Sequence, residues 1–107
     1  MGFRETYSHE EVSKLVSQGA LLVDVRDERA YREEHIKGAI NVPLKKIEEM
    51  KDSIPRDRPV IVYCGSVQCT ASYLAARKLS ALGYDNIVRF VPGLKGWKEA
   101  GLPTERG

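Results

Sequence analysis

The sequence predicts an α/β fold in which helices cover both faces of a parallel sheet. Short apolar runs typical of buried strands alternate along the chain with segments of helical periodicity, and that alternation is typical of parallel sheets. The chain has 107 residues, 42% of them hydrophobic and 30% charged. This size and composition indicate one globular domain. We expect residues 1–107 to form that single domain, with an ordered core from about residue 4 to residue 103.

The chain is predicted to begin with a helix and a buried strand. Ser8 followed by Glu11 is a capping-box pattern, which marks a helix N-terminus. Gly19 is well placed to end that helix, because glycine readily adopts the left-handed conformation found after helix C-termini. The apolar run at residues 21–25 then predicts a buried strand.

A short helix, a strand and another helix are predicted next. Asp27 is a residue type that caps helices, and the helix that it begins is expected to end at about Glu34. Residues 39–42 predict a short strand. Pro43 is favoured in a first helical turn and begins a predicted helix that continues through Met50.

Two further strand–helix pairs complete the predicted fold. Residues 59–63 are a buried strand, and residues 71–82 carry apolar side chains at three- and four-residue spacing, which predicts a helix. Residues 87–91 predict another strand and residues 93–100 a last short helix. The ordered part is expected to end at Pro103.

Cys64 is the most informative residue, because it stands where a buried strand leads into a helix. The loop between them consists of Gly65, Ser66, Val67, Gln68, Cys69 and Thr70. Ligands of parallel sheets bind beyond the carboxyl ends of the strands, and helix N-termini favour negative charge. We therefore expect the Cys64 thiol to ionise below its free pKa of about 8.5 and to act as a nucleophile. The alternative is a buried structural cysteine.

Charge and composition exclude several other classes of function. A net charge of +2, with acids and bases interspersed, does not favour a nucleic acid or a membrane surface as a partner. No apolar stretch reaches the length of a membrane span and the N-terminus lacks a signal-peptide core, so we expect a cytoplasmic location. Two cysteines and two histidines without paired-ligand spacing argue against zinc. We expect no metal and no cofactor.

Several segments together resemble the motifs of the single-domain rhodanese (sulfurtransferase) family. They cover nearly the whole chain in the family's order: residues 22–26, 34–43, 62–64, 91–97 and 101–103. The resemblance implies a five-stranded parallel sheet flanked by helices on both faces. It also implies that Cys64 accepts a sulfane sulfur, becomes a persulfide and passes the sulfur to a thiophilic acceptor. The donor would be thiosulfate, polysulfide or a persulfide, and the acceptor cyanide, a thiol or a protein thiol.

Four matched residues are interpreted as structural support for the site. Asp24 and Arg26 are close enough in sequence to join one buried charge network, whose loss would harm folding more than chemistry. His35 is interpreted as a hydrogen-bonding scaffold residue and Trp97 as a core anchor.

The loop is expected to hold the persulfide mainly through its backbone. Gly65 and Ser66 let successive N–H groups converge on a negatively charged sulfur, and the hydroxyls of Ser66 and Thr70 are further candidate donors. The family often has a basic residue just before a Ser or Thr of this loop, but Cys69 stands there. With no Lys or Arg in the loop, we expect less anionic donors such as polysulfide to be preferred over thiosulfate.

Two alternatives concern the residues of this loop. Phosphatases that share the fold need a Cys-x5-Arg loop, and the sixth position after Cys64 is Thr70, which disfavours phosphatase activity. Cys69 is either a packing residue in the first helical turn or a resolving thiol that attacks the Cys64 persulfide. The alternative function is a non-catalytic rhodanese-type module that binds a partner or senses redox state through the Cys64–Cys69 pair.

Overall fold

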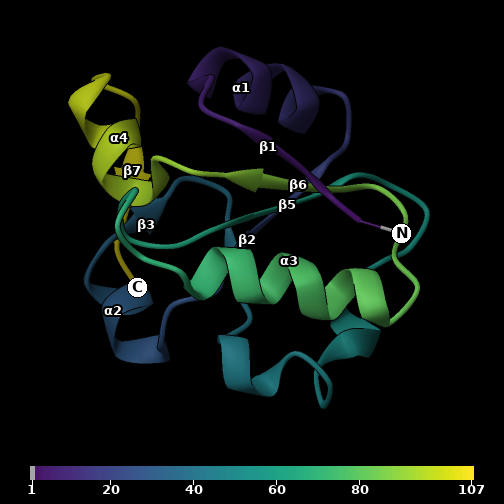
Figure 1. The fold of residues 1–107 in the computed structure, drawn as a ribbon. Helices are drawn as coiled ribbons and strands as arrows, with labels where there is room; N and C mark the ends of the chain where they lie inside the picture. The colour runs from purple at the N-terminus through teal and green to yellow at the C-terminus, as the bar shows by residue number, and fades with distance from the viewer. Residues whose placement is uncertain (1) are drawn as a thin grey trace.

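A computed structural model describes residues 2–107, which form a five-stranded parallel sheet with helices on both faces. The strand order is β1-β6-β5-β2-β4. The strands are β1 (Arg4–Thr6), β2 (Leu21–Asp24), β4 (Ile40–Asn41), β5 (Val60–Tyr63) and β6 (Ile87–Phe90). Figure 1 shows α1 (His9–Ser17) and α4 (Gly93–Glu99) on one side of the sheet and α3 (Ala71–Ala81) on the other. The predicted fold class is confirmed.

The edge strand β1 was not predicted from the residue pattern. Its sequence, Arg4-Glu5-Thr6, is polar and shows no apolar alternation, yet it pairs in parallel with β6 over three residues. An edge strand needs little apolar surface because only one of its sides is hydrogen-bonded within the sheet. The fifth strand implied by the family resemblance is therefore β1.

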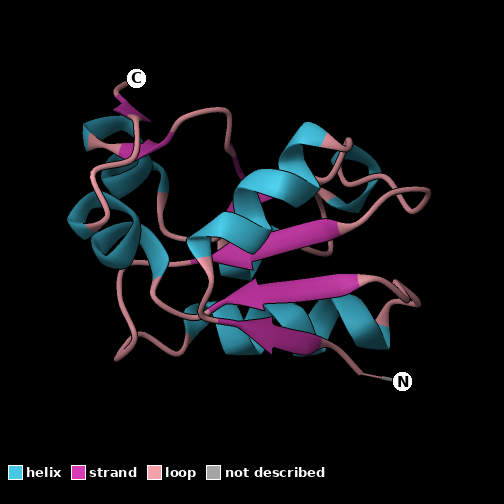
Figure 2. Cartoon of the chain, turned by 90° about the horizontal axis from the view of Figure 1, so that it is seen from above, coloured by secondary structure: helices cyan, strands magenta, loops and turns pink. Residues whose placement is uncertain are grey.

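A second pairing joins segments far apart in the chain. The two-residue strands β3 (His35–Ile36) and β7 (Thr104–Glu105) pair antiparallel. Regular structure therefore continues beyond Pro103, where the residue pattern predicted the end of the ordered part. Figure 2 shows this small pairing near the C-terminus, away from the main sheet.

The predicted helix caps are present, with one difference. The Ser8 hydroxyl accepts a hydrogen bond from the Glu11 N–H at 3.0 Å and caps α1. Glu11 does not return the bond to Ser8; its carboxylate pairs with Arg4 of β1 at 2.7 Å. Asp27 caps α2 (Glu28–Glu33) by accepting from the Ala30 N–H at 2.9 Å.

The helix predicted from Pro43 through Met50 is wrong. The segment forms two single 3-10 turns instead, η1 (Leu44–Lys46) and η2 (Lys51–Ser53). The Leu44 N–H donates to the Val25 carbonyl at 3.0 Å, which holds the first turn against the end of β2. Ile47 is completely buried under the sheet. Because Leu44 is bonded to the end of β2 and Ile47 is buried, the segment forms two separate turns and not one continuous helix.

The core consists of one apolar layer on each face of the sheet, and β5 contributes to both. Val60, Val62 and Cys64 belong to the layer beneath α3, whereas Ile61 and Tyr63 belong to the layer beneath α1 and α4. Because both faces are buried, the strand is a continuous apolar run. Cys64 thus enters the layer that α3 covers.

Candidate active site

Cys64 directly follows β5 and lies under the first turn of α3. Its side chain is buried, with the residue 1% exposed. The Cys64 Sγ lies 3.4 Å from the Cys69 carbonyl oxygen and 3.3 Å from the Ser72 Oγ. The strand end, the loop of residues 65–70 and α3 therefore converge on one sulfur atom, as the sequence predicts for this edge of the sheet.

The start of α4 holds the entry to the loop. The Leu94 N–H donates to the Cys64 carbonyl and the Lys95 N–H donates to the Gly65 carbonyl, each at 2.9 Å. Gly93 has a φ of +63°. A Cβ on Gly93 would lie only 2.3 Å from the Cys64 carbonyl oxygen. Only glycine fits this approach of two backbones beside Cys64.

Replacing Gly93 by Ala is therefore expected to destabilise the domain by about 1–3 kcal/mol, because backbone strain and a backbone clash combine. The loop entry must also shift, so an activity that depends on Cys64 should fall at least several-fold. Thermal unfolding and steady-state kinetics check the two effects. Gly101→Ala is the control: Gly101 also has a positive φ, +77°, but its Cβ would meet nothing within 4 Å. Equal stability of the two variants would contradict the role of the Cys64 contact.

The hydroxyl that contacts the Cys64 sulfur belongs to Ser72, not to Ser66 or Thr70. Ser72 is fully buried in the first turn of α3. Thr70 is exposed and makes no capping hydrogen bond to the helix. Within residues 2–107, no hydrogen bond joins the Ser66 or Thr70 hydroxyl to Cys64. The expectation that these two hydroxyls donate to the outer sulfur of a persulfide stays a prediction.

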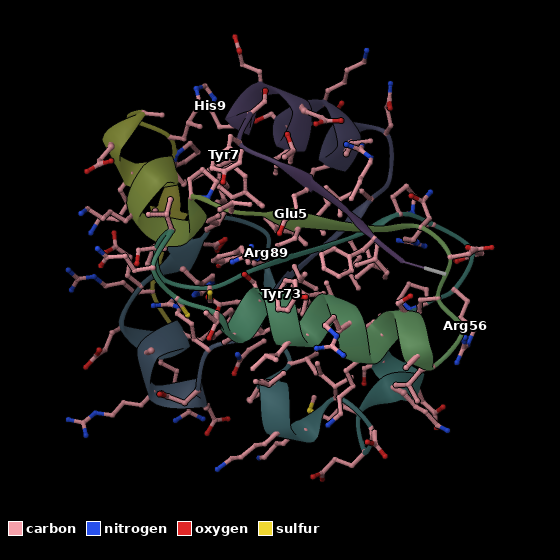
Figure 3. All side chains as sticks on the ribbon, viewed as in Figure 1. Glu5, Tyr7, His9, Arg56, Tyr73 and Arg89 are labelled. Carbon is pink, nitrogen blue, oxygen red and sulfur yellow. The ribbon has the colours of Figure 1, made fainter. Side chains whose placement is uncertain are left out.

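Arg89 is the cation of the site, and the residue pattern did not identify it. It lies on β6, is 8% exposed, and makes three side-chain contacts. Its Nε donates to the Ser72 Oγ at 2.9 Å, its Nη2 to the Cys69 carbonyl at 3.2 Å, and its Nη1 to the Glu5 carboxylate at 2.7 Å. Figure 3 shows Glu5 and Arg89 close together between the sheet and α3. Arg89 thus contacts both groups that surround the Cys64 sulfur.

One signal in the sequence points to Arg89. It is the only charged residue in the apolar strand Ile87-Val88-Arg89-Phe90, and alternation places it on the same face as Ile87. That face is the one that Cys64 enters. A buried cation requires partners, so a charge in this position indicates a built polar site.

The two thiols have pKa shifts in opposite directions. Burial, followed by the interaction with the Cys69 thiol, raises the pKa of Cys64 despite favourable bonds from Ser72. Burial also opposes ionisation of Cys69, but bonds from the Cys64 thiol and from the Ala71 and Gly65 N–H groups outweigh it. With the nearby charge of Arg89, these bonds lower the pKa of Cys69. The prediction that Cys64 itself has a lowered pKa is wrong for this resting arrangement.

Asp24 and Arg26 lie in one charge network beside the site, as expected from their spacing. Asp24 is fully buried, and its two carboxylate oxygens accept from the Arg26 Nε and Nη2 at 2.8–3.2 Å. The Asn41 side chain donates to the carbonyls of both residues at 3.0 Å. This network ties the ends of β2 and β4 together.

His35 and Trp97 make their contacts away from Cys64. The His35 Nδ1 is 2.8 Å from the Tyr31 carbonyl, and its ring stacks on Tyr31. The Trp97 Nε1 donates to the Pro103 carbonyl at 2.9 Å, and its ring packs edge-on against Phe90. These contacts support the interpretation of both as scaffold residues.

Two hollows border the loop, and neither Cys64 nor Cys69 is among the residues that line them. One of about 270 Å³ is lined by Arg26, Gly65, Leu94, Lys95, Lys98 and Glu99. A smaller one of about 160 Å³ lies between the loop tip and α4. Three of the six residues around the first hollow are cationic, which favours a small anion. A larger hollow, of about 410 Å³, lies between the N-terminal segment and α3, and neither cysteine lines it.

Within residues 2–107, no three His, Cys, Asp or Glu side chains are arranged to hold a metal ion. No helix in this range has the length and apolar character that crossing a bilayer requires.

Comparison with known proteins identifies relatives along nearly the whole chain. A family model for the rhodanese-like domain matches residues 8–100. The thiosulfate sulfurtransferase GlpE of Actinobacillus succinogenes is 32% identical, covering 98% of this chain and 93% of that protein. The HTH-type transcriptional regulator Rv0324 of Mycobacterium tuberculosis is 34% identical, covering 80% of this chain but 38% of the regulator.

A solved structure agrees with these sequence matches. The crystal structure of the BH2092 protein from Bacillus halodurans superposes with a TM-score of 0.83 at 30% identity, covering 91% of this chain and 73% of that one. The sequence motifs, the five-stranded parallel sheet and the family-model match over residues 8–100 all indicate the same family. The chain belongs to the rhodanese-like domain family.

Proposed function

We propose that this protein is a sulfurtransferase in which Cys64 accepts a sulfane sulfur as a persulfide and passes it to a thiol or cyanide. Membership of the family and the similarity to thiosulfate sulfurtransferases support sulfur transfer in general. The observation that carries the specific assignment is the position of Cys64. Cys64 directly follows the buried strand β5, and its sulfur contacts the Ser72 hydroxyl. The loop that begins after it is hydrogen-bonded to the start of α4.

The reaction divides into two displacements at sulfur. The Cys64 thiolate attacks the outer sulfur of the donor; with thiosulfate, the S–S bond breaks and sulfite leaves with its electron pair. The persulfide then gives its outer sulfur to the acceptor nucleophile, and the Cys64 thiolate leaves. Both steps develop negative charge on sulfur, which preorganised donors near Ser72 and the loop backbone stabilise.

Thiosulfate fits this site better than the loop sequence alone suggests. The preference for less anionic donors rested on the absence of Lys and Arg from residues 65–70. Cations from other elements compensate: Arg89 of β6 lies behind the loop, and Lys95 of α4 borders both hollows. We propose that thiosulfate is a donor, alongside polysulfide and persulfides.

Replacing Lys95 by Ala is expected to raise the KM for thiosulfate about threefold at low ionic strength, the effect of losing one exposed cation. The difference should shrink as salt is added, because the side chain is exposed and salt screens its charge. Steady-state kinetics over a range of salt concentrations measures it. Lys45→Ala, which removes an exposed cation from η1, is the matched control. Identical KM values for both variants at low salt would contradict a role for Lys95.

Mass spectrometry after exposure to thiosulfate tests the proposed function. The protein should gain one sulfur atom, and peptide mapping should place it on Cys64. Adding cyanide should return the protein to its original mass and yield thiocyanate. Failure to gain sulfur from thiosulfate, polysulfide or a persulfide would contradict the proposal, and so would sulfur found only on Cys69 from the earliest times.

A second candidate function is a non-catalytic or redox-sensing module. The similarity to Rv0324 favours keeping it, because the matched region makes up only 38% of a protein named as a transcriptional regulator. A module of this kind would bind a partner or cycle its two thiols without turnover. Sustained formation of thiocyanate, over many equivalents per protein molecule, would exclude it.

A further inference from the structure

We propose that Cys69 is an internal acceptor that converts the bound sulfane sulfur to sulfide. In this step the Cys69 thiolate attacks the Cys64 persulfide, releases sulfide and leaves a Cys64–Cys69 disulfide. The inference rests on the proposed function, because it requires Cys64 to carry the persulfide first.

The two cysteines are in direct interaction in the folded protein. Both are free thiols, and the Cys64 Sγ lies 3.4 Å from the carbonyl oxygen of Cys69 itself. The two side-chain thiols also interact with each other, which influences the ionisation of both. The main chain of Cys69 therefore already lies against the Cys64 sulfur in the folded loop.

Cys69 belongs to the loop whose backbone is expected to hold the persulfide. Its N–H donates to the Ser66 carbonyl at 3.1 Å, which folds the loop back on itself, and its carbonyl oxygen lies 3.4 Å from the Cys64 Sγ. A sulfur added to Cys64 carries negative charge, which the N–H groups of this loop stabilise. The outer sulfur of the persulfide is therefore held by the same loop that carries Cys69.

Charge and exposure suit Cys69 for attack. Arg89 donates to the Cys69 carbonyl at 3.2 Å, and its positive charge favours the Cys69 thiolate, the nucleophilic form. Cys69 is partly exposed whereas Cys64 is buried. A packing role does not explain the cation bonded to Cys69.

The step balances without an outside oxidant. A bond forms between the Cys69 sulfur and the Cys64 Sγ, the bond from Sγ to the outer sulfur breaks, and the outer sulfur leaves as HS⁻ with the electron pair. The two cysteines lose two electrons and the sulfane sulfur gains them. An external thiol or dithiol must then reduce the disulfide before another cycle. The added activity is therefore a thiol-dependent release of sulfide from sulfane donors.

The test follows a single loaded protein over time without any acceptor. Reduced wild-type protein is loaded with thiosulfate, desalted to remove sulfite and excess donor, and sampled for intact mass and released sulfide. We expect the mass gain of one sulfur to be replaced by a loss of two hydrogens from the reduced mass, with one sulfide per disulfide. Adding dithiothreitol and more thiosulfate should then give continuous sulfide release.

Cys69→Ala is the informative variant. It should still gain sulfur on Cys64, which also shows that the site is folded, but its persulfide should last at least tenfold longer and release no sulfide without an added thiol. Leu74→Ala, an exposed truncation in the first turns of α3, should decay like the wild type.

Each outcome supports or contradicts a specific statement. Equal persulfide lifetimes in wild type and Cys69→Ala would overturn the internal acceptor. Migration of the sulfur to Cys69 without a disulfide would overturn it as well. If the wild type and Cys69→Ala both fail to load, the proposed function fails and this inference fails with it. Loading without resolution contradicts this inference alone.

Discussion

Replacing Cys64 by Ser is expected to lower sulfur transfer by more than about a thousandfold, the usual scale for loss of an enzymatic nucleophile. A serine hydroxyl has a far higher pKa than a thiol and does not form a persulfide. The fold should survive, because serine is slightly smaller and Ser72 lies within hydrogen-bond distance of the replaced atom. We expect a stability change of about 1 kcal/mol, typical of conservative buried substitutions.

Turnover of thiosulfate with cyanide, together with thermal unfolding, measures both effects for Cys64→Ser. Cys69→Ser is the matched control, since it makes the same chemical change five residues along the same loop and should still load sulfur on Cys64. Residual activity of the Cys64 variant above about a tenth of the wild type would contradict its assignment as the nucleophile.

The parts of the fold that follow from local burial were predictable. Residues of β2, β5 and β6 are apolar because both faces of the parallel sheet are covered, and this pattern is visible in any short window of sequence. Polar β1 gives no such pattern, because its place depends on hydrogen bonds to β6, more than 80 residues away. The pairing of β3 with β7 could not be predicted from local periodicity for the same reason, because it joins two-residue segments far apart in the chain.

The candidate site was predictable where one loop defines it and not where several elements meet. Cys64 could be placed from the strand, loop and helix around it. Ser72 and Arg89 could not be joined to Cys64, because their contact depends on how α3 and β6 pack against the loop. The direction of the Cys64 pKa was mispredicted for a related reason. Burial raises the pKa of Cys64, whereas interactions with the Cys64 thiol, with the Ala71 and Gly65 N–H groups and with Arg89 lower the pKa of Cys69.

Replacing Arg89 by Met is expected to lower kcat/KM for thiosulfate about a hundredfold, the usual scale for loss of a charged group that stabilises developing charge. The substitution keeps much of the side chain's length but removes the hydrogen bonds to Ser72 and Cys69 and the positive charge that contacts both. Arg89→Lys keeps the positive charge but lacks the planar group with several N–H donors. We therefore expect a smaller loss of kcat/KM, about tenfold. Arg89 is a positioning residue: it acts through the two groups that contact the Cys64 sulfur.

A purely structural role for Arg89 would change stability without changing thiol ionisation, and this difference decides the interpretation. Removing the guanidinium should raise the pKa of Cys69, so the pH profile of its alkylation in Arg89→Met should shift to higher pH. Glu5→Gln is the control, because it neutralises the partner of Arg89 at the exposed end and leaves the guanidinium in place. We expect that variant to retain kcat/KM within about threefold. An unshifted alkylation profile in Arg89→Met, with kcat/KM close to the wild type, would assign Arg89 to folding alone and leave backbone N–H groups as the main stabilisers of charge at this site.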